Sequence, residues 1–100
     1  MKDLSQIEVI DNVTESQFEI EVDGQLAFIE YIIKEDKIYL THTSVPKGLE
    51  GQGVGTVLVQ KTLDRLTGKE LVLLPMCSFV ANYVNENPKY QSLLSDGYQM

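Results

Sequence analysis

Three glycines at alternate positions constrain this chain more than any other feature. Gly51, Gly53 and Gly55 stand directly before Val57-Leu58-Val59, where an apolar stripe of helical spacing begins and runs on to Leu66. Because glycine costs backbone entropy, three of them ahead of a helix need a reason. The first N–H groups of a helix lack partners and lie at the positive end of its dipole. The stretch therefore predicts a phosphate site at a helix N-terminus.

Two familiar phosphate motifs do not fit this stretch. A P-loop requires a lysine after its last glycine, and none follows Gly55. The dinucleotide fingerprint requires two residues between its second and third glycines, whereas only Val54 separates Gly53 from Gly55. A sharp helix entry without any ligand stays open as a simpler interpretation.

Composition narrows the class of protein. The 100 residues, 43% of them apolar, predict a single domain over 1–100. A net charge of −7 argues against nucleic acid. It would attract a cationic amine as substrate, although it can equally serve only to keep the protein soluble. An anion would then depend on backbone dipoles and nearby lysines such as Lys47. A single cysteine and the absence of any long apolar run predict a cytoplasmic protein without membrane contact, and we expect no metal site.

The pattern of apolar residues predicts a mixed α/β sheet. Residues 18–22 alternate as a half-buried strand, and residues 25–33 form a near-continuous apolar run that predicts a strand covered on both faces. A third strand is expected over 38–45 and a fourth over 70–74, parallel to the third because a helix joins them. A second helix is expected from an N-cap at Ser78 to Pro88. Residues 7–10 only hint at a strand that Asp11-Asn12 would interrupt, and nothing is predicted beyond Tyr90.

Three motifs in order resemble a known family. Glu50-Gly51-Gln52-Gly53-Val54-Gly55 is similar to the pyrophosphate loop of the GNAT superfamily of N-acetyltransferases, Arg/Gln-x-x-Gly-x-Gly/Ala, except that Glu50 replaces a basic or amide residue. His42-Thr43-Ser44-Val45-Pro46 precedes this loop. Leu74-Pro75-Met76-Cys77-Ser78-Phe79-Val80 and Asn87-Pro88-Lys89-Tyr90 follow it. Together these segments, over roughly residues 17–90, resemble the small single-domain branch of the superfamily.

The resemblance implies a minimal GNAT-like fold that binds acetyl-CoA. It implies a sheet that splays between the strands at 38–45 and 70–74, with the pantetheine arm in the splay. It also implies transfer of an acetyl group to an amine of a small molecule or protein. Larger members have two helices that form a lip over the substrate, and too few residues precede Phe18 for these. The acceptor site is therefore expected to be open.

The resemblance also assigns cofactor contacts. Backbone N–H groups of the loop would hold the pyrophosphate, one strand end would pair with the pantetheine amides like an added strand, and two helix residues would wall the cleft. Lys47 could compensate for Glu50. The expected cofactor-binding residues are Val45, Gly51, Gln52, Gly53, Val54, Gly55, Thr56, Phe79 and Asn82.

Cys77 is the one residue with obvious nucleophile chemistry. It stands at the start of the second predicted helix, where the dipole would lower the pKa of its thiol. Members of the small branch are thought to use this cysteine near the CoA thiol. Covalent catalysis, a contact with the cofactor and simple burial all stay open, because free cysteine is also a common core residue.

Three further residues are candidates for proton transfer. His42, expected on the strand face of Leu40 and Ser44, could act as a general base or be structural. Tyr83 resembles the tyrosine that protonates the departing CoA thiolate in the superfamily, although its spacing also suits packing. Glu30 lies in a central strand, where many members keep a base that acts through water.

Two other functions stay open at this stage. The short N-terminus, Glu50 and the lack of an unmistakable acid–base pair would also suit a CoA-binding module without transferase activity, acting as a sensor or partner subunit. A nucleotide-binding protein unrelated to CoA is the third possibility. Titration of CoA, acetyl-CoA, ATP and NAD would separate them.

Overall fold

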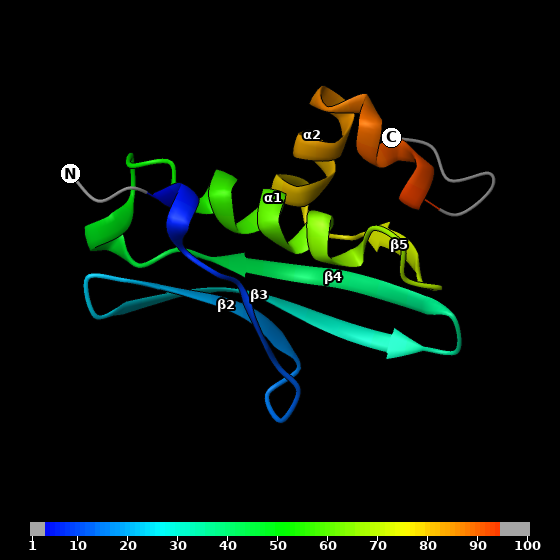
Figure 1. Cartoon of the computed structure of the whole chain (residues 1–100), viewed down its shortest axis with the longest axis horizontal. Helices are drawn as coiled ribbons and strands as arrows, with labels where there is room; N and C mark the ends of the chain where they lie inside the picture. The colour runs from blue at the N-terminus through cyan, green and yellow to red at the C-terminus, as the bar shows by residue number, and fades with distance from the viewer. Residues whose placement is uncertain (1–3, 95–100) are drawn as a thin grey trace.

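A five-stranded mixed sheet forms one layer of the computed structural model, which describes residues 4–94 (Figure 1). Neighbouring strands follow the chain order, and β1 to β4 are antiparallel while β5 is parallel to β4. This arrangement confirms the predicted α/β fold with a mixed sheet. The strands are β1 (Ile10–Asn12), β2 (Gln17–Val22), β3 (Gln25–Lys34), β4 (Lys37–Ser44) and β5 (Val72–Pro75).

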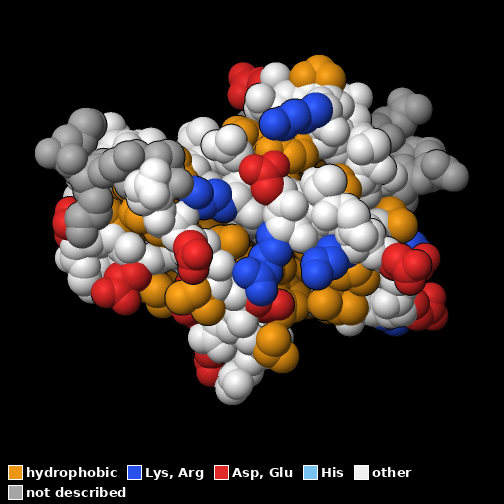
Figure 2. Space-filling model, in the orientation of Figure 1, with side chains coloured by type: hydrophobic (Ala, Val, Ile, Leu, Met, Phe, Trp, Pro, Cys, Tyr) orange, Lys and Arg blue, Asp and Glu red, His pale blue; other side chains and the backbone are white. Residues whose placement is uncertain are grey.

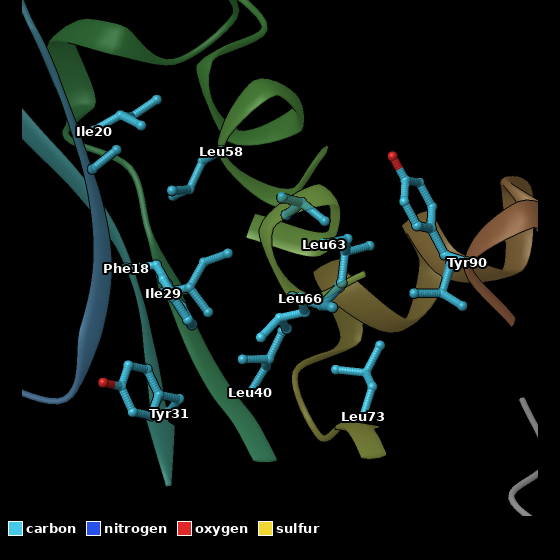
Figure 3. Packing of buried hydrophobic residues seen from close by; sticks show 14 of the residues in the cluster. Phe18, Ile20, Ile29, Tyr31, Leu40, Leu58, Leu63, Leu66, Leu73 and Tyr90 are labelled. Carbon is cyan, nitrogen blue, oxygen red and sulfur yellow. The ribbon is translucent and has the colours of Figure 1, made fainter. Parts of the chain in front are cut away.

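Two helices form the second layer, and both lie on the same side of the sheet (Figure 1). Figure 3 shows the core between the layers, where Ile29 and Leu40 of the sheet point toward Leu58 and Leu63 of α1. Burial of these apolar side chains is the main stabilising contribution to the fold. The helices are α1 (Val54–Leu66) and α2 (Ser78–Glu86), and three 3₁₀ turns are η1 (Leu4–Gln6), η2 (Lys47–Leu49) and η3 (Pro88–Leu93).

The turn and helix-end residues behave as their chemistry dictates. Asp23 and Gly24 both have positive φ, 51° and 77°, which suits the tight hairpin between β2 and β3. Gly68, with φ of 87°, stands just past the end of α1. The helix α2 ends at Glu86, two residues before Pro88, because proline cannot continue a helix.

The prediction that β3 is covered on both faces was wrong. Ala27, Ile29 and Tyr31 are buried against the helices, but Leu26 and Ile32 on the other face are 40% and 58% exposed. No described element lies over that second face, so the strand alternates between a buried and an open side. Its apolar sequence does not reflect burial on both sides.

The prediction that Asp11-Asn12 interrupts a strand was also wrong. Both residues belong to β1, which pairs with β2 at the edge of the sheet. The Tyr31 hydroxyl donates a 2.7 Å hydrogen bond to Oδ1 of Asp11, and Nδ2 of Asn12 donates to the Glu19 carboxylate at 2.8 Å. Polar side chains are tolerated in this strand because cross-strand partners satisfy them.

The residues from Tyr90 to Leu94, for which the sequence predicts no element, pack against α1 and β5. Tyr90 is buried within η3, and its hydroxyl donates a 2.6 Å hydrogen bond to Asp64 of α1. Leu94 forms an isolated parallel bridge with Leu73 of β5. Residues 95–100, which belong to the same predicted tail, lie outside the described residues.

The strands β4 and β5 separate partway along their length, as the resemblance implies. They pair from Lys37 with Val72 as far as Leu40 with Pro75, and β4 then continues to Ser44 without a β5 neighbour. The N–H groups of Met76 and Cys77 both donate to the Leu40 carbonyl at 3.0 Å, where β5 turns away. We call this break in strand pairing, between the last four residues of β4 and the start of α2, the β4–β5 gap.

A β-bulge sets the direction of the side chains at this gap. Tyr31 pairs with Leu40 while Glu30 pairs with His42, so Thr41 is an extra residue in β4. Because strand side chains alternate, one extra residue reverses the faces beyond it. Thr43 then lies opposite the buried Ile29, on the helix side of the sheet.

Candidate functional site

The glycine loop ends in a helix N-terminus that faces a surface hollow. Gly51 and Gly53 both have φ of 79°, a conformation that side chains disfavour, and Gly53 is the N-cap of α1. The hollow has a volume of about 340 Å³, and the first turn of α1 contains no acidic residue. The lining residues are Val45, Leu49, Glu50, Gly51, Gly53, Val54, Gly55, Thr56 and Phe79.

Gly55 is needed for space rather than for its backbone angle. A Cβ at this position would meet Cζ of Phe79 at 3.0 Å and Cγ2 of Val45 at 3.3 Å. Val45, predicted to pair with the pantetheine arm, and Phe79, predicted to wall the cleft, therefore both lie against the first turn of α1. The unpartnered N–H groups of Val54, Gly55 and Thr56 belong to this turn. Together they line a concave surface at a helix N-terminus, the kind of place where backbone N–H groups can hold an anion.

A second hollow of about 340 Å³ adjoins the first. It shares Thr56 and Phe79 with the first hollow and extends along α2 past Asn82 and Tyr83 to Asn85 and Glu86. The ring of Phe79, which is 43% exposed, stands where the two hollows meet. The predicted wall residues Phe79 and Asn82 thus belong to one continuous run of surface depressions.

Gln52 and Glu50 take different positions in the loop. The Gln52 side chain is exposed and donates to the Gly48 carbonyl at 3.0 Å, so it braces the loop from outside the hollow. Glu50 is also exposed but lines the hollow, where its carboxylate opposes an anion. Lys47, expected to compensate it, is exposed and is not among the lining residues.

Cys77 lies at the gap between β4 and α2, as the N-cap of that helix. The helix thus begins one residue before the predicted boundary, with Ser78 as its first residue. The Cys77 thiol donates a 3.4 Å hydrogen bond to Oγ1 of Thr43. Thr43 was not among the predicted site residues, because only the bulge turns this side chain toward α2.

The pKa of the Cys77 thiol is lowered from its ordinary value of 9.0. Partial burial alone would raise this pKa, but the Thr43 hydroxyl and the N–H groups of Phe79 and Val80 favour the thiolate and outweigh it. Neither N–H group makes a capping hydrogen bond of full geometry to the sulfur. The dipole of α2 acts in the same direction.

His42 does not lie where the sequence pattern placed it. The bulge at Thr41 moves His42 to the face of the sheet that no helix covers, opposite Glu30, and both side chains are exposed. Its predicted neighbour Leu40 stays on the buried face. The two candidate bases therefore lie together, on the side of the sheet away from Cys77 and the helices.

Tyr83 belongs to a separate group of side chains. Its ring lies 5.9 Å from that of Tyr90, which donates its hydroxyl hydrogen to Asp64. Burial and then the Asp64 carboxylate raise the pKa of Tyr83, against a smaller opposing effect of the Tyr90 hydroxyl. Tyr83 lines the second hollow, whereas Cys77 lines neither hollow. The structure does not bring the three predicted catalytic residues, Cys77, His42 and Tyr83, into one cluster.

Charge is mixed over the side of the molecule that Figure 2 shows, where both layers are visible. In Figure 2, basic and acidic side chains are interspersed with apolar ones. An anion at the loop would therefore depend on local backbone dipoles more than on a broad positive field. None of the helices within residues 4–94 is long and apolar enough to cross a membrane.

The match to a family model decides the relationship. The model described as GCN5-related N-acetyltransferase matches residues 17–93, which contain the glycine loop, the β4–β5 gap and α2. The chain belongs to the GCN5-related N-acetyltransferase family. The prediction of a small GNAT-like domain is thereby confirmed.

Curated relatives and a solved structure agree with this family. Protein NATD1 of Homo sapiens is 31% identical over 81 residues, which cover 77% of this chain and 71% of the relative. Protein NATD1 of Xenopus tropicalis is 30% identical, with 77% and 73% covered. The NMR solution structure of a GCN5-like candidate N-acetyltransferase from Staphylococcus aureus superposes with a TM-score of 0.68. It shares 28% identity and covers 95% of this chain and 93% of its own.

Proposed function

We propose that this chain transfers an acetyl group from acetyl-CoA to an amine, in the cytoplasm. The observation that carries the proposal is the hollow at the N-terminus of α1, which Val45 and Phe79 flank and in which Gly55 leaves room. Membership of the GCN5-related family supports the same chemistry. When bound, acetyl-CoA supplies an acetyl thioester that an uncharged amine can attack.

In this proposal the glycine loop binds the pyrophosphate of acetyl-CoA and the β4–β5 gap binds its pantetheine arm. The N–H groups of Val54, Gly55 and Thr56 hold the pyrophosphate. The main chain at Val45 and the end of β4, which has no β5 neighbour, would pair with the amides of an extended arm. Phe79 and Asn82 exclude water along the arm.

Proton transfer is assigned to residues on both sides of the gap. His42 is exposed on β4 beside the gap, and an imidazole nitrogen there can accept the proton that the amine must lose. Tyr83, whose raised pKa keeps its hydroxyl protonated, is the candidate donor to a departing thiolate.

A charge placed in the first turn of α1 tests the cofactor site. Thr56→Glu puts a carboxylate beside the expected pyrophosphate, while an acid in the first turn of a helix favours folding. Gln60→Glu is the matched control, because it adds the same charge at an exposed position further along α1. Thermal unfolding would show that both variants are folded.

The measurement is calorimetric titration of CoA and acetyl-CoA, with ATP and NAD as competitors for the same site. We expect Thr56→Glu to weaken CoA binding at least tenfold, and Gln60→Glu to change it less than about threefold. In NMR spectra, CoA should shift amide signals mainly from Val45 to Leu58 and near Cys77. Equal affinity of both variants, or stronger binding of NAD, would contradict the assignment.

A CoA-binding module without transferase activity remains the second candidate function. It is favoured by the separation of His42, on the open face, from Cys77 and Tyr83 on the helix side. Incubation with acetyl-CoA and a panel of amines distinguishes the two functions. Tight CoA binding without any release of free CoA thiol would favour the module.

A further inference from the structure

The face of the sheet opposite the helices is an exposed apolar surface with an acidic border. We call it the open face, and it is defined by Glu19, Glu21, Leu26, Phe28, Glu30 and Ile32. Leu26 and Ile32 are 40% and 58% exposed, and no described element covers them. The face thus presents apolar side chains interrupted by carboxylates, a combination that suits a partner carrying both apolar and cationic groups.

Acidic and apolar side chains alternate across the two strands of the open face. In the antiparallel register, Glu19 of β2 lies opposite Phe28 of β3, and Glu21 lies opposite Leu26. Directly opposite residues are close enough to contact the same ligand group. A ligand that lies along these strands would therefore meet a carboxylate and an apolar side chain at each step.

The carboxylates of this face have no cationic partner among the described residues. Glu19 accepts hydrogen bonds from the neutral amides of Asn12 and Gln17, at 2.8 and 2.6 Å. Within residues 4–94, no ion pair involves Glu21 or Glu30. An exposed carboxylate with only neutral partners attracts a cation from solution.

The cations of these strands lie at the other end of the sheet. Lys34 and Lys37 pair with each other in register beyond Ile32, and Lys37 forms a 3.5 Å ion pair with Asp36. The acidic end is therefore next to His42 and the β4–β5 gap, and the lysines are far from it along the strands. The open face is therefore acidic at the end near His42 and carries its lysines at the other end.

We propose that the open face docks a basic polypeptide segment whose cations alternate with apolar residues. Its cations would meet Glu19, Glu21 and Glu30, and its apolar residues would cover Leu26 and Phe28. A second copy of this chain fits less well, because it would bring another net charge of −7 to an acidic surface. A small amine fits less well because it leaves the apolar side chains uncovered.

Docking does not depend on acetyl transfer, but it has a consequence for it. A lysine held at Glu30 would lie beside His42, at the margin of the gap. The docked segment would then present an amine from the face opposite the cofactor hollow. This last step rests on the proposed function, whereas the docking itself is tested without any acetyl-CoA.

The test uses a capped peptide of alternating lysine and valine, titrated into the ¹⁵N-labelled full chain. We expect amide shifts in β2 and β3, and affinity that falls as salt rises. A peptide of alternating glutamate and valine should not bind. The double variant Glu21→Gln/Glu30→Gln should weaken binding about fivefold, while Glu70→Gln, an exposed carboxylate before β5, should not.

Three outcomes would overturn the proposal. Shifts confined to the helix layer would place the peptide elsewhere. Equal binding by the double variant and by Glu70→Gln would show that the acidic border plays no part. A dimer in light scattering whose interface protects β2 and β3 from hydrogen exchange would make a second copy the occupant.

Discussion

The Cys77 thiol donates a 3.4 Å hydrogen bond to Oγ1 of Thr43, across the gap that opens where β4 and β5 separate. This contact joins the N-cap of α2 to the strand beyond the bulge. Burial raises the pKa of Cys77, but once the thiol ionises the Thr43 hydroxyl can donate to the thiolate, and this is the largest of the causes that lower the pKa. The reactivity of the cysteine therefore depends on a bulge at Thr41, ten residues before Gly51 of the glycine loop.

Removal of this hydrogen bond should make the thiol less reactive. In the wild type, the rate of alkylation by iodoacetamide should reach half of its maximum below pH 9.0, because the pKa of Cys77 is lowered. Thr43→Val keeps the side-chain shape but removes the hydroxyl, so the midpoint should move to higher pH. Thr41→Val, on the same strand but bonded to the Glu30 carbonyl, is the control. Equal midpoints in all three proteins would assign the shift to the helix alone.

Neutralising Glu50 should strengthen binding of CoA. Its carboxylate lines the hollow and repels a pyrophosphate, so Glu50→Gln should tighten binding about threefold at low salt, with a smaller gain at high salt. Glu70→Gln removes the same charge away from the hollow and should leave affinity unchanged. Calorimetry at two salt concentrations measures both variants. A loss of affinity in Glu50→Gln would show that Glu50 orders the loop.

Gly55 and Phe79 should be energetically coupled. An alanine Cβ at position 55 would meet the Phe79 ring at 3.0 Å, and this exposed ring can move aside, so Gly55→Ala should fold. The helix gains about 0.5–1 kcal/mol from alanine over glycine. We expect the full gain in unfolding free energy only when Phe79 is also replaced by leucine. Urea unfolding of the four proteins measures the coupling, and strict additivity would mean that the ring does not restrict position 55.

Tyr31 should make the stability of the fold depend on alkaline pH. Burial, then the hydrogen bond to Asp11 and the charge of that carboxylate, raise the pKa of Tyr31 from 10.0 to about 12. The folded state thus favours the protonated hydroxyl, and this contribution is fully present below pH 10 and is lost as pH rises toward 12. Tyr31→Phe should flatten the fall in unfolding free energy over that range, and Asp11→Asn should reduce it. An unchanged slope in Tyr31→Phe would assign the fall to other groups.

The sequence was sufficient for the elements whose signals are local. The hairpin at Asp23-Gly24, the helix after Gly53 and the stop at Pro88 each follow from the conformational limits of one or two residues. The parallel pairing of β4 with β5 follows from the helix that joins them. These features needed no knowledge of distant contacts.

The positions of His42 and Thr43 could not be derived in the same way. Strict alternation from Ile38 predicts His42 on the buried face, and one extra residue at Thr41 reverses that result. No residue type at 41 identifies a bulge, because threonine suits an ordinary strand equally well. The burial of β3 on one face only could not be derived for a different reason. A run of apolar residues does not reveal whether one or two layers cover a sheet.

The last prediction concerns the route of acetyl transfer. Cys77 has a lowered pKa, but it lines neither hollow, and direct attack by the amine requires only positioning and loss of a proton. We therefore expect Cys77→Ala to retain a substantial fraction of the activity, and the rate to rise with pH as the amine deprotonates. Cys77→Ser is the companion variant, because it preserves a hydroxyl that can still contact Thr43.

Intact mass spectrometry after brief mixing with acetyl-CoA alone distinguishes the two routes. Direct transfer leaves the protein mass unchanged until an amine is added, whereas a covalent route first moves the acetyl group from the CoA sulfur to Sγ of Cys77 and releases free CoA. We expect no adduct at the catalytic time scale. An acetyl group mapped to Cys77 that passes to added amine at the rate of turnover, together with an inactive Cys77→Ala, would establish the covalent route instead. In that case the contact between Cys77 and the Thr43 hydroxyl would be catalytic. Thr43→Val should then slow the first acetylation at neutral pH more than at pH 10, because the thiolate forms in either protein once the pH is high.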